Sequence, residues 1–209
     1  LESAPWTSRT EHTSLVFDDR MWVLGGYDGA SRLNDVWYSR DGTSWTLATA
    51  HAGWSPREKH SSVVFGNKMW VIGGDGGDSS TYGKSNDVWA SEDGVNWTEV
   101  AATTPWRPRS DHASVVYDNR IWVLGGDPFY QYFGKLNDVW YSYNGRDWRL
   151  ATAYADWPVR SGHAAAVFQD RIWILGGAIN GGRYTSSILG NDIWFTAPEA
   201  DASNWKSYP

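Results

Sequence analysis

The sequence contains no cysteine, which excludes disulfide bonds, thiol nucleophiles and thiolate metal sites. It has no apolar run near the roughly 18 residues that a membrane-spanning helix needs, and its first residues lack the apolar core of a signal peptide. The formal net charge of −6 offers no cationic excess to neutralise nucleic-acid phosphates. We therefore expect no membrane insertion and no nucleic-acid partner. The compartment stays open, with an extracellular or cell-surface location favoured.

Aromatic residues, in contrast, are abundant. They make up 16% of the 209 residues, within a hydrophobic fraction of 41%, and 16 of them are tryptophans. Disordered chains are poor in both classes, so the composition indicates a folded globule with a substantial core. Because disulfides are excluded, its stability must come from buried aromatic area and from sheet hydrogen bonds.

A Trp-x-x-Arg-x-x-His motif recurs four times. Thirteen residues after each histidine lies a Gly-Gly pair, and an Asn-Asp-Val/Ile-Trp motif follows it. A further tryptophan closes each repeat, so the 16 tryptophans fill four positions in four copies. Such periodicity predicts a repeat architecture rather than a set of unrelated segments. The motif begins at Trp6, Trp54, Trp106 and Trp157, and the Asn-Asp motif begins at Asn34, Asn86, Asn137 and Asn191.

Each repeat contains four segments of strand length. "HSSVVFG" and "KMWVIGG" are rich in Val, Ile and Trp, and a short turn separates them. "NDVWYS" predicts a third strand, and the closing tryptophan begins a fourth. No segment has a helical period, so the sequence predicts an all-β, antiparallel fold. Between the third and fourth strands, type I′ hairpins are predicted at Asp41-Gly42, Asp93-Gly94 and Asn144-Gly145.

The stretch "PREKHSSVVFGNKMWVIGG", followed by "NDVW" and a later tryptophan, resembles the kelch repeat. The resemblance covers essentially the whole chain and implies a β-propeller in which each repeat forms one four-stranded blade. It predicts a single domain over residues 1–209, with blades at approximately 6–53, 54–105, 106–156 and 157–209. We expect a four-bladed ring closed within one chain. A homodimer with eight blades, or a piece of a longer array, remains open.

The segments between the Gly-Gly pair and the Asn-Asp motif differ in length and chemistry from copy to copy, whereas the frame is constant. In an antiparallel blade these loops share one end with the Trp-x-x-Arg-x-x-His segment. A fixed scaffold with variable loops is typical of a binding surface. The predicted ligand-binding residues are Arg9, Arg57, Arg109, Arg160, His12, His60, His112, His163, Tyr27, Arg32, Tyr82, Phe129, Tyr130, Tyr132, Arg183 and Tyr184.

The repeated side chains allow two interpretations each. The arginines suit a ligand carboxylate or sulfate, or they pair with the repeat aspartates and lock neighbouring strands. The histidines suit a metal in fourfold geometry, or they hydrogen-bond the backbone; we expect no metal and no cofactor. The tryptophans that open each repeat could stack on sugar rings or pack inside the fold. The repeat aspartates are Asp35, Asp87, Asp138 and Asp192.

The chain offers no Ser–His–Asp spacing and no acidic pair outside the repeat pattern, and it lacks the cysteine that kelch-type copper oxidases use. The sequence therefore predicts a non-enzymatic binding module that presents its loop-bearing face to a protein segment or a glycan. One alternative is an enzyme acting on a sugar acid at the axial pocket, with arginine as carboxylate clamp and histidine as acid and base. Another is an assembly unit of a larger surface protein.

Overall fold

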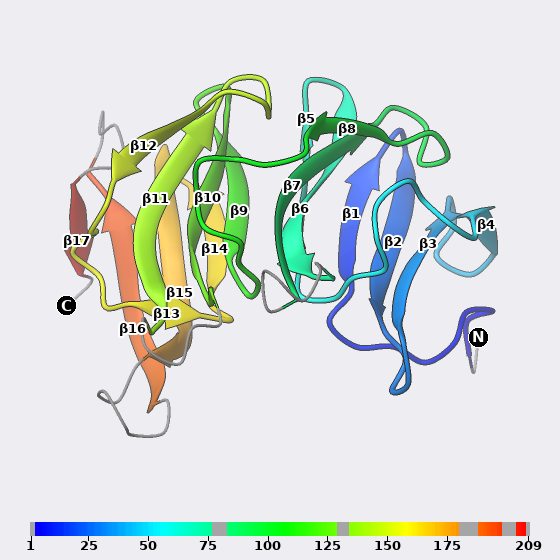
Figure 1. The fold of residues 1–209 in the computed structure, drawn as a ribbon, viewed down its shortest axis with the longest axis horizontal. Helices are drawn as coiled ribbons and strands as arrows, with labels where there is room; N and C mark the ends of the chain where they lie inside the picture. The colour runs from blue at the N-terminus through cyan, green and yellow to red at the C-terminus, as the bar shows by residue number, and fades with distance from the viewer. Residues whose placement is uncertain (1–2, 77–82, 129–133, 180–187, 198–203, 208–209) are drawn as a thin grey trace. The chain divides into compact units, whose positions relative to one another are not determined.

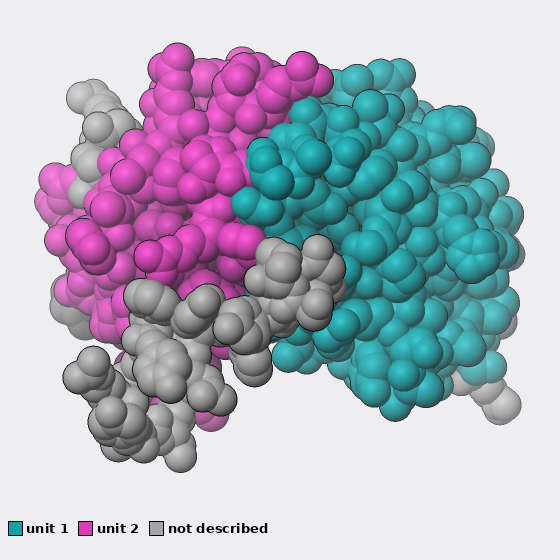
Figure 2. Space-filling model, viewed as in Figure 1, with its two compact units in different colours: residues 1–103 teal, residues 104–209 magenta. Residues whose placement is uncertain are grey.

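The computed structural model describes residues 3–76, 83–128, 134–179, 188–197 and 204–207, and over these ranges the chain forms strands, turns and bends (Figure 1). It divides into two compact units, residues 1–103 and 104–209 (Figure 2). Among the described residues, no helix has the length and apolar character needed to cross a membrane.

The first unit holds two four-stranded sheets, in which each strand pairs antiparallel with the next along the chain. The apolar, β-branched runs of the sequence supply the first two strands of each sheet, as expected from their β propensity. The first sheet consists of β1 (Thr13–Phe17), β2 (Arg20–Tyr27), β3 (Arg32–Ser39) and β4 (Trp45–Thr49). The second consists of β5 (Ser61–Phe65), β6 (Lys68–Asp75), β7 (Lys84–Ser91) and β8 (Thr98–Ala101).

The second unit repeats the pattern, but hydrogen bonds join its two repeats into one nine-stranded sheet. The link is β13 (Arg160–Ser161), which pairs with both β11 and β15. The antiparallel all-β prediction is thus confirmed, whereas the closed four-bladed ring stays a prediction. The remaining strands are β9 (Ala113–Tyr117), β10 (Arg120–Gly126), β11 (Leu136–Ser142), β12 (Trp148–Thr152), β14 (Ala164–Phe168), β15 (Arg171–Ile179), β16 (Ile188–Thr196) and β17 (Trp205–Ser207).

The predicted type I′ hairpins between the third and fourth strands are wrong. In the first repeat Ser39 pairs with Trp45, so five residues form the loop, and of the Asp41-Gly42 pair only the glycine has positive φ. The Asp41 carboxylate accepts hydrogen bonds from the backbone amides of Thr43 and Ser44 at 2.8 and 2.6 Å. A side chain that caps its own loop in this way replaces the tight turn.

The two-residue turns with positive φ at both positions lie instead between the first and second strands. Asp18 and Asp19 have φ of 50° and 54°, and Phe17 pairs directly with Arg20. Asp and Asn tolerate this left-handed conformation because their short side chains can hydrogen-bond locally. The turn type therefore follows the backbone requirement of a two-residue connection rather than the presence of an Asp-Gly pair.

Apolar side chains fill the space between consecutive sheets of a unit. In each repeat we call the face that carries the positions of Trp22 and Leu24 the forward face, and the opposite face, which carries the positions of Met21 and Val23, the rear face. In the first unit the forward face of repeat 1 carries Trp22 and Leu24, which pack with Met69 and Val71 on the rear face of repeat 2. In the second unit the equivalent core pairs residues of β9, β10 and β11 with the rear face of repeat 4. Because successive side chains of a strand point to opposite faces, the continuous apolar runs place apolar side chains on both faces of each sheet.

The loop between the third and fourth strands of repeat 2 packs against a tryptophan of repeat 1. The indole of Trp22 is fully buried, and its Nε1 donates to the Phe17 carbonyl at 2.9 Å. Gly94 lies directly against this ring, with φ of 74°, and a Cβ at that position would collide with Trp22 Cζ3. Glycine is thus required here both by the backbone conformation and by the close approach.

Candidate functional site

The segment that opens each repeat returns to the end of the second strand, where the variable loops begin. Thr10 and Tyr27 exchange two backbone hydrogen bonds of 2.9 Å, and Glu58 and Asp75 exchange bonds of 3.0 and 2.8 Å. Ser110 pairs with Asp127 in the same way, and β13 takes this place in the last repeat. The structure therefore brings the segments that carry the frame arginines and the starts of the variable loops to the same end of the strands in each sheet.

Each frame arginine forms a bidentate ion pair with the repeat aspartate of its own repeat. Arg57 Nη1 and Nη2 donate to the two carboxylate oxygens of Asp87 at 2.8 and 2.7 Å. Nη1 also donates to the Gly73 carbonyl at 2.8 Å, while Nε and Nη2 donate to Ser55. All five N–H donors of the guanidinium are thereby used. The same pairing joins Arg9 to Asp35, Arg109 to Asp138 and Arg160 to Asp192.

The aspartate of each pair receives a further donor. Trp89 Nε1 donates to Asp87 Oδ2 at 2.7 Å, and Trp37, Trp140 and Trp194 do the same in their repeats. Burial by itself would raise the pKa of Asp35, but the hydrogen bonds from Arg9 and Trp37 outweigh it and hold that pKa below its ordinary value. The carboxylate is therefore ionised and saturated by the frame.

This geometry favours the structural interpretation of the arginines. Arg57 and Arg109 are fully buried, and a ligand carboxylate could reach Arg57 only by displacing Asp87 or the carbonyl acceptors. Removing a partner from such a pair would leave an uncompensated buried charge. The predicted ligand-binding role of the four arginines stays a prediction.

Three of the four frame histidines, His60, His112 and His163, are buried. Burial, followed by the charge of Arg57 and then His12, lowers the pKa of His60 to about 3, and its Nε2 lies 2.8 Å from Thr13 Oγ1. Burial and the charge of Arg160 lower the pKa of His163 to about 3 as well. His12 is exposed, in contrast to His60 and His163. Over the described ranges, no group of three or more His, Asp or Glu side chains is placed to hold a metal ion.

The tryptophans that open the repeats pack inside the fold. Trp54 and Trp157 are 1% and 0% exposed, and each meets the closing tryptophan of its own repeat edge to face, at 5.9 Å between ring centroids. Trp6 is partly exposed and meets Trp45 at 4.4 Å. The rings of Trp54 and Trp157 are buried too deeply to stack on a sugar without unfolding their surroundings.

Arg32 is the predicted loop residue that the structure describes in most detail. Its guanidinium forms ion pairs with Asp75 at 2.6 Å and with Glu58 at 3.2 Å, and Asp75 also pairs with Lys84 at 2.7 Å. These four residues form an ion-pair cluster that links the loop ends of repeats 1 and 2. The Arg32 side chain is 39% exposed, so it reaches solvent although it is paired.

The acidic members of this cluster, Glu58 and Asp75, were not predicted. Their sequence signal is positional, since one follows the frame arginine directly and the other follows the Gly-Gly pair. Tyr27, also predicted, donates its hydroxyl to the Gly29 carbonyl at 2.8 Å. The other predicted loop residues lie outside the described ranges: Tyr82, Phe129, Tyr130, Tyr132, Arg183 and Tyr184.

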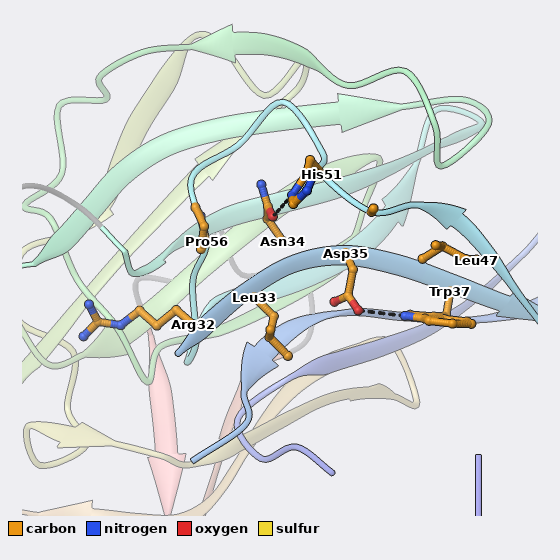
Figure 3. A pocket seen from close by; sticks show the side chains of 9 residues that line it. Arg32, Leu33, Asn34, Asp35, Trp37, Leu47, His51 and Pro56 are labelled. Atoms are coloured by element: carbon orange, nitrogen blue, oxygen red, sulfur yellow. Dashed lines mark hydrogen bonds between the residues drawn. The ribbon is translucent and has the colours of Figure 1, made fainter. Parts of the chain in front are cut away.

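A shallow cleft of about 310 Å³ lies beside β3 in the first unit, between the start of that strand and the linker to repeat 2 (Figure 3). Its polar side chains already have partners in the chain. Asp35 is held by Arg9, and Asn34 donates to the carbonyls of Ala52 and Trp54 at 3.1 and 3.0 Å. The His51 Nδ1 lies 3.4 Å from Asn34 Oδ1. The cleft thus offers a ligand few free polar groups.

Repeats of four antiparallel strands, each locked by one arginine, one aspartate and one tryptophan, define the chain as a β-repeat protein. The model of the KLHDC2/KLHL20/DRC7 Kelch-repeats domain matches residues 1–126. The chain therefore belongs to the kelch-repeat family.

Three relatives show where such repeats occur. The Leucine-zipper-like transcriptional regulator 1 homolog of Drosophila melanogaster is 31% identical over 140 residues, which are 63% of this chain and 14% of the relative. The Ras guanine nucleotide exchange factor F of Dictyostelium discoideum is 31% identical over 98 residues, 45% of this chain and 8% of the relative. Beta-scruin of Limulus polyphemus is 34% identical over 88 residues, 39% of this chain and 9% of the relative. The matched part is a small fraction of each relative's length.

Proposed function

We propose that this chain is a non-enzymatic binding module that recognises a protein segment through the loop-bearing ends of its sheets. The observation that supports this most directly is the internal saturation of the frame. Arg57 uses all five donors within the chain, and the Asp87 carboxylate accepts from both Arg57 and Trp89. Recognition then falls to the residues that differ between repeats, because the invariant ones are occupied with each other.

The ion-pair cluster illustrates what these loop ends offer. Arg32, Glu58, Asp75 and Lys84 present both signs of charge at one edge, and Arg32 is exposed enough to exchange a partner. Mixed charges with a partly exposed arginine fit the polar side chains and carbonyls of a peptide. A glycan would use exposed aromatic faces, and the buried Trp54 and Trp157 do not supply them.

The alternative of a sugar-acid enzyme draws little support from the same geometry. A general acid or base works best with a pKa near the operating pH, whereas the pKa of His60 and of His163 lies at about 3. The carboxylate clamp that this alternative assigns to the frame arginines would compete with the repeat aspartates. The assembly alternative is compatible with a binding module and differs from it in having no separate ligand.

The test is selection from a displayed library of random peptides, run in parallel with a glycan array. The loop variant replaces residues 75–85 with the seven residues 27–33 of repeat 1, and Arg32→Ala removes the exposed member of the cluster. Lys68→Ala is the matched control, since Lys68 is the first residue of β6 and, among the described contacts, its side chain pairs only with the exposed Glu92 at 3.0 Å.

We expect peptides that bind the wild-type protein and Lys68→Ala but lose affinity for the loop variant and for Arg32→Ala. Peptides that bind all four proteins equally would place recognition elsewhere and overturn the proposal. Binding to glycans alone, or to neither library, would overturn it as well.

A further inference from the structure

The first and last repeats each carry an exposed apolar sheet face. On the forward face of repeat 4, Phe168 is 60% exposed and Leu175 is 38% exposed. On the rear face of repeat 1, Val16 is 70% exposed and Met21 is 40% exposed. End repeats of such arrays normally carry polar outer faces, because an apolar face left in water favours association.

Three of the equivalent positions are buried where repeats 1 and 2 meet, although Val167, the counterpart of Val16 in repeat 4, is still 42% exposed. Phe17 and Leu24, on the forward face of repeat 1, are 8% and 0% exposed under the rear face of repeat 2. Met69, the counterpart of Met21, is 0% exposed in that contact. The two open faces are therefore the two halves of a contact that the chain already makes.

The side chains on the two open faces match those of the contacts inside the units. Trp22 and Leu24 pack with Met69 and Val71 in the first unit. Trp122 and Leu124 take the same part against Ile172 and Ile174 in the second unit. The forward face of repeat 4 offers Trp173 and Leu175, and the rear face of repeat 1 offers Met21, with Val23 beside it already buried.

His12 is the frame histidine of repeat 1. In the first unit His60 is 5% exposed, and Thr13 of the preceding repeat supplies the hydroxyl beside its Nε2. His163 is 7% exposed on the rear face of repeat 4, where the equivalent position of the preceding repeat is Ala113. His12 is exposed, and the forward face of repeat 4 carries Ala164 at the same position. The open faces thus match the contact inside the second unit, where an alanine stands at the position of Thr13.

We infer that the rear face of repeat 1 docks on the forward face of repeat 4 of a second copy of this chain. The contact is head to tail, so it uses different faces of the two copies; where the rotation between copies closes, contacts of this kind form a ring rather than a filament. This self-association goes beyond the proposed recognition of a protein segment and uses a different surface.

The test measures the mass of the chain in solution by light scattering over a range of concentrations. Phe168→Arg blocks the forward face of repeat 4, and Met21→Arg blocks the rear face of repeat 1. Both positions are exposed, and near-UV circular dichroism verifies that each variant stays folded. Val95→Arg is the matched control, because Val95 is 47% exposed and lies in the turn between β7 and β8, which belongs to neither face.

We expect wild type and Val95→Arg to form a species of twice the 23.5 kDa chain mass. Each blocked variant should be monomeric, with self-association at least about tenfold weaker. An equimolar mixture of Phe168→Arg and Met21→Arg should regain a two-chain species, since one intact forward face can still meet one intact rear face.

Three results would overturn the inference. A monomeric wild type up to about 100 μM would mean that the chain covers these faces itself or that other repeats cover them. Dimers of Met21→Arg alone would indicate a contact between two forward faces. A mixture that stays monomeric while the wild type dimerises would exclude the head-to-tail arrangement.

Discussion

Arg57 and Asp87, separated by 30 residues in sequence, are joined by two parallel hydrogen bonds of 2.8 and 2.7 Å, and the arginine is fully buried. Because the pair spans the opening segment and β7, it fixes the segment before the first strand to the third strand of the same repeat. The equivalent pair recurs in every repeat, so we expect these pairs to determine the stability of the sheets.

Substitution of Arg57 by alanine should lower the free energy of unfolding by about 3–5 kcal/mol, because Asp87 then remains without its cation. Arg57→Lys should recover part of this loss, since lysine supplies charge without the bidentate geometry. Urea denaturation measures both changes, with the exposed Arg40→Ala as control. A loss below about 1 kcal/mol in Arg57→Ala would contradict the structural role.

Gly94→Ala should destabilise the first unit more than Gly66→Ala. Both glycines have positive φ, at 74° and 57°, but a Cβ on Gly94 collides with Trp22 while one on Gly66 meets no atom within 4 Å. We expect about 1–2 kcal/mol for Gly66→Ala from backbone strain alone. Gly94→Ala should cost about 1–3 kcal/mol more because the core is overpacked. Equal losses in thermal or urea unfolding would show that the contact with Trp22 is not tight.

Asn34→Ala should lower the free energy of unfolding by about 1–3 kcal/mol. Its amide donates to the carbonyls of Ala52 and Trp54, and so holds the linker between repeats 1 and 2 against β3. Thr46→Ala, on the exposed side of β4, is the control and should change stability by less than about 0.5 kcal/mol. If both variants unfold at the same urea concentration, the linker is held by its backbone alone.

Stability should fall as the pH is lowered from 7 to 5.5. The pKa of His60 is about 3 in the folded protein and about 6.5 when unfolded, so the unfolded chain binds more protons in this range. Lowering the pH therefore favours unfolding, by about 1 kcal/mol for each such histidine between these two values. The stabilising contribution is complete above the unfolded pKa and is lost as the pH falls towards 3.

Urea denaturation of wild type and His60→Gln at pH 7.0 and 5.5 measures this effect. The variant should lose less stability on acidification than the wild type, and His163 accounts for part of what remains. Asp35 and Asp192 do not confound the comparison, since their lowered pKa values place their titration at lower pH. An identical loss in both proteins would mean that His60 becomes protonated in the folded state.

Much of the fold could be predicted because the repeat is written in the sequence four times. The frame spacing, the alternating apolar strands and the Trp-x-x-Arg-x-x-His segment predict four antiparallel strands per repeat, as observed within each unit. The predicted turn at Asp41-Gly42 was wrong, because residue types at a turn do not determine how many residues it contains. Ser39 pairs with Trp45, and the Asp41 side chain stabilises the longer loop.

The candidate site was predicted less completely. The sequence correctly placed the loop ends beside the frame arginines, because alternating strand connections require it. It could not decide between a ligand and a structural partner for Arg57, since both need the same residue type. It also missed Glu58 and Asp75, which meet Arg32 from the neighbouring repeat, because no other repeat has two acidic residues at these two positions.

The sequence by itself determined the period, the strands and the chemical identity of the frame, because periodic patterns of apolar and polar residues constrain local structure directly. The tertiary structure decided which side chains are buried and paired within the fold and which are exposed to solvent. Burial showed Arg57 and His60 to be enclosed and Phe168 and Met21 to be exposed, although each has a counterpart in every repeat. Identical residues differ in this way because exposure depends on whether a neighbouring sheet covers them, and that neighbour is not part of the local sequence.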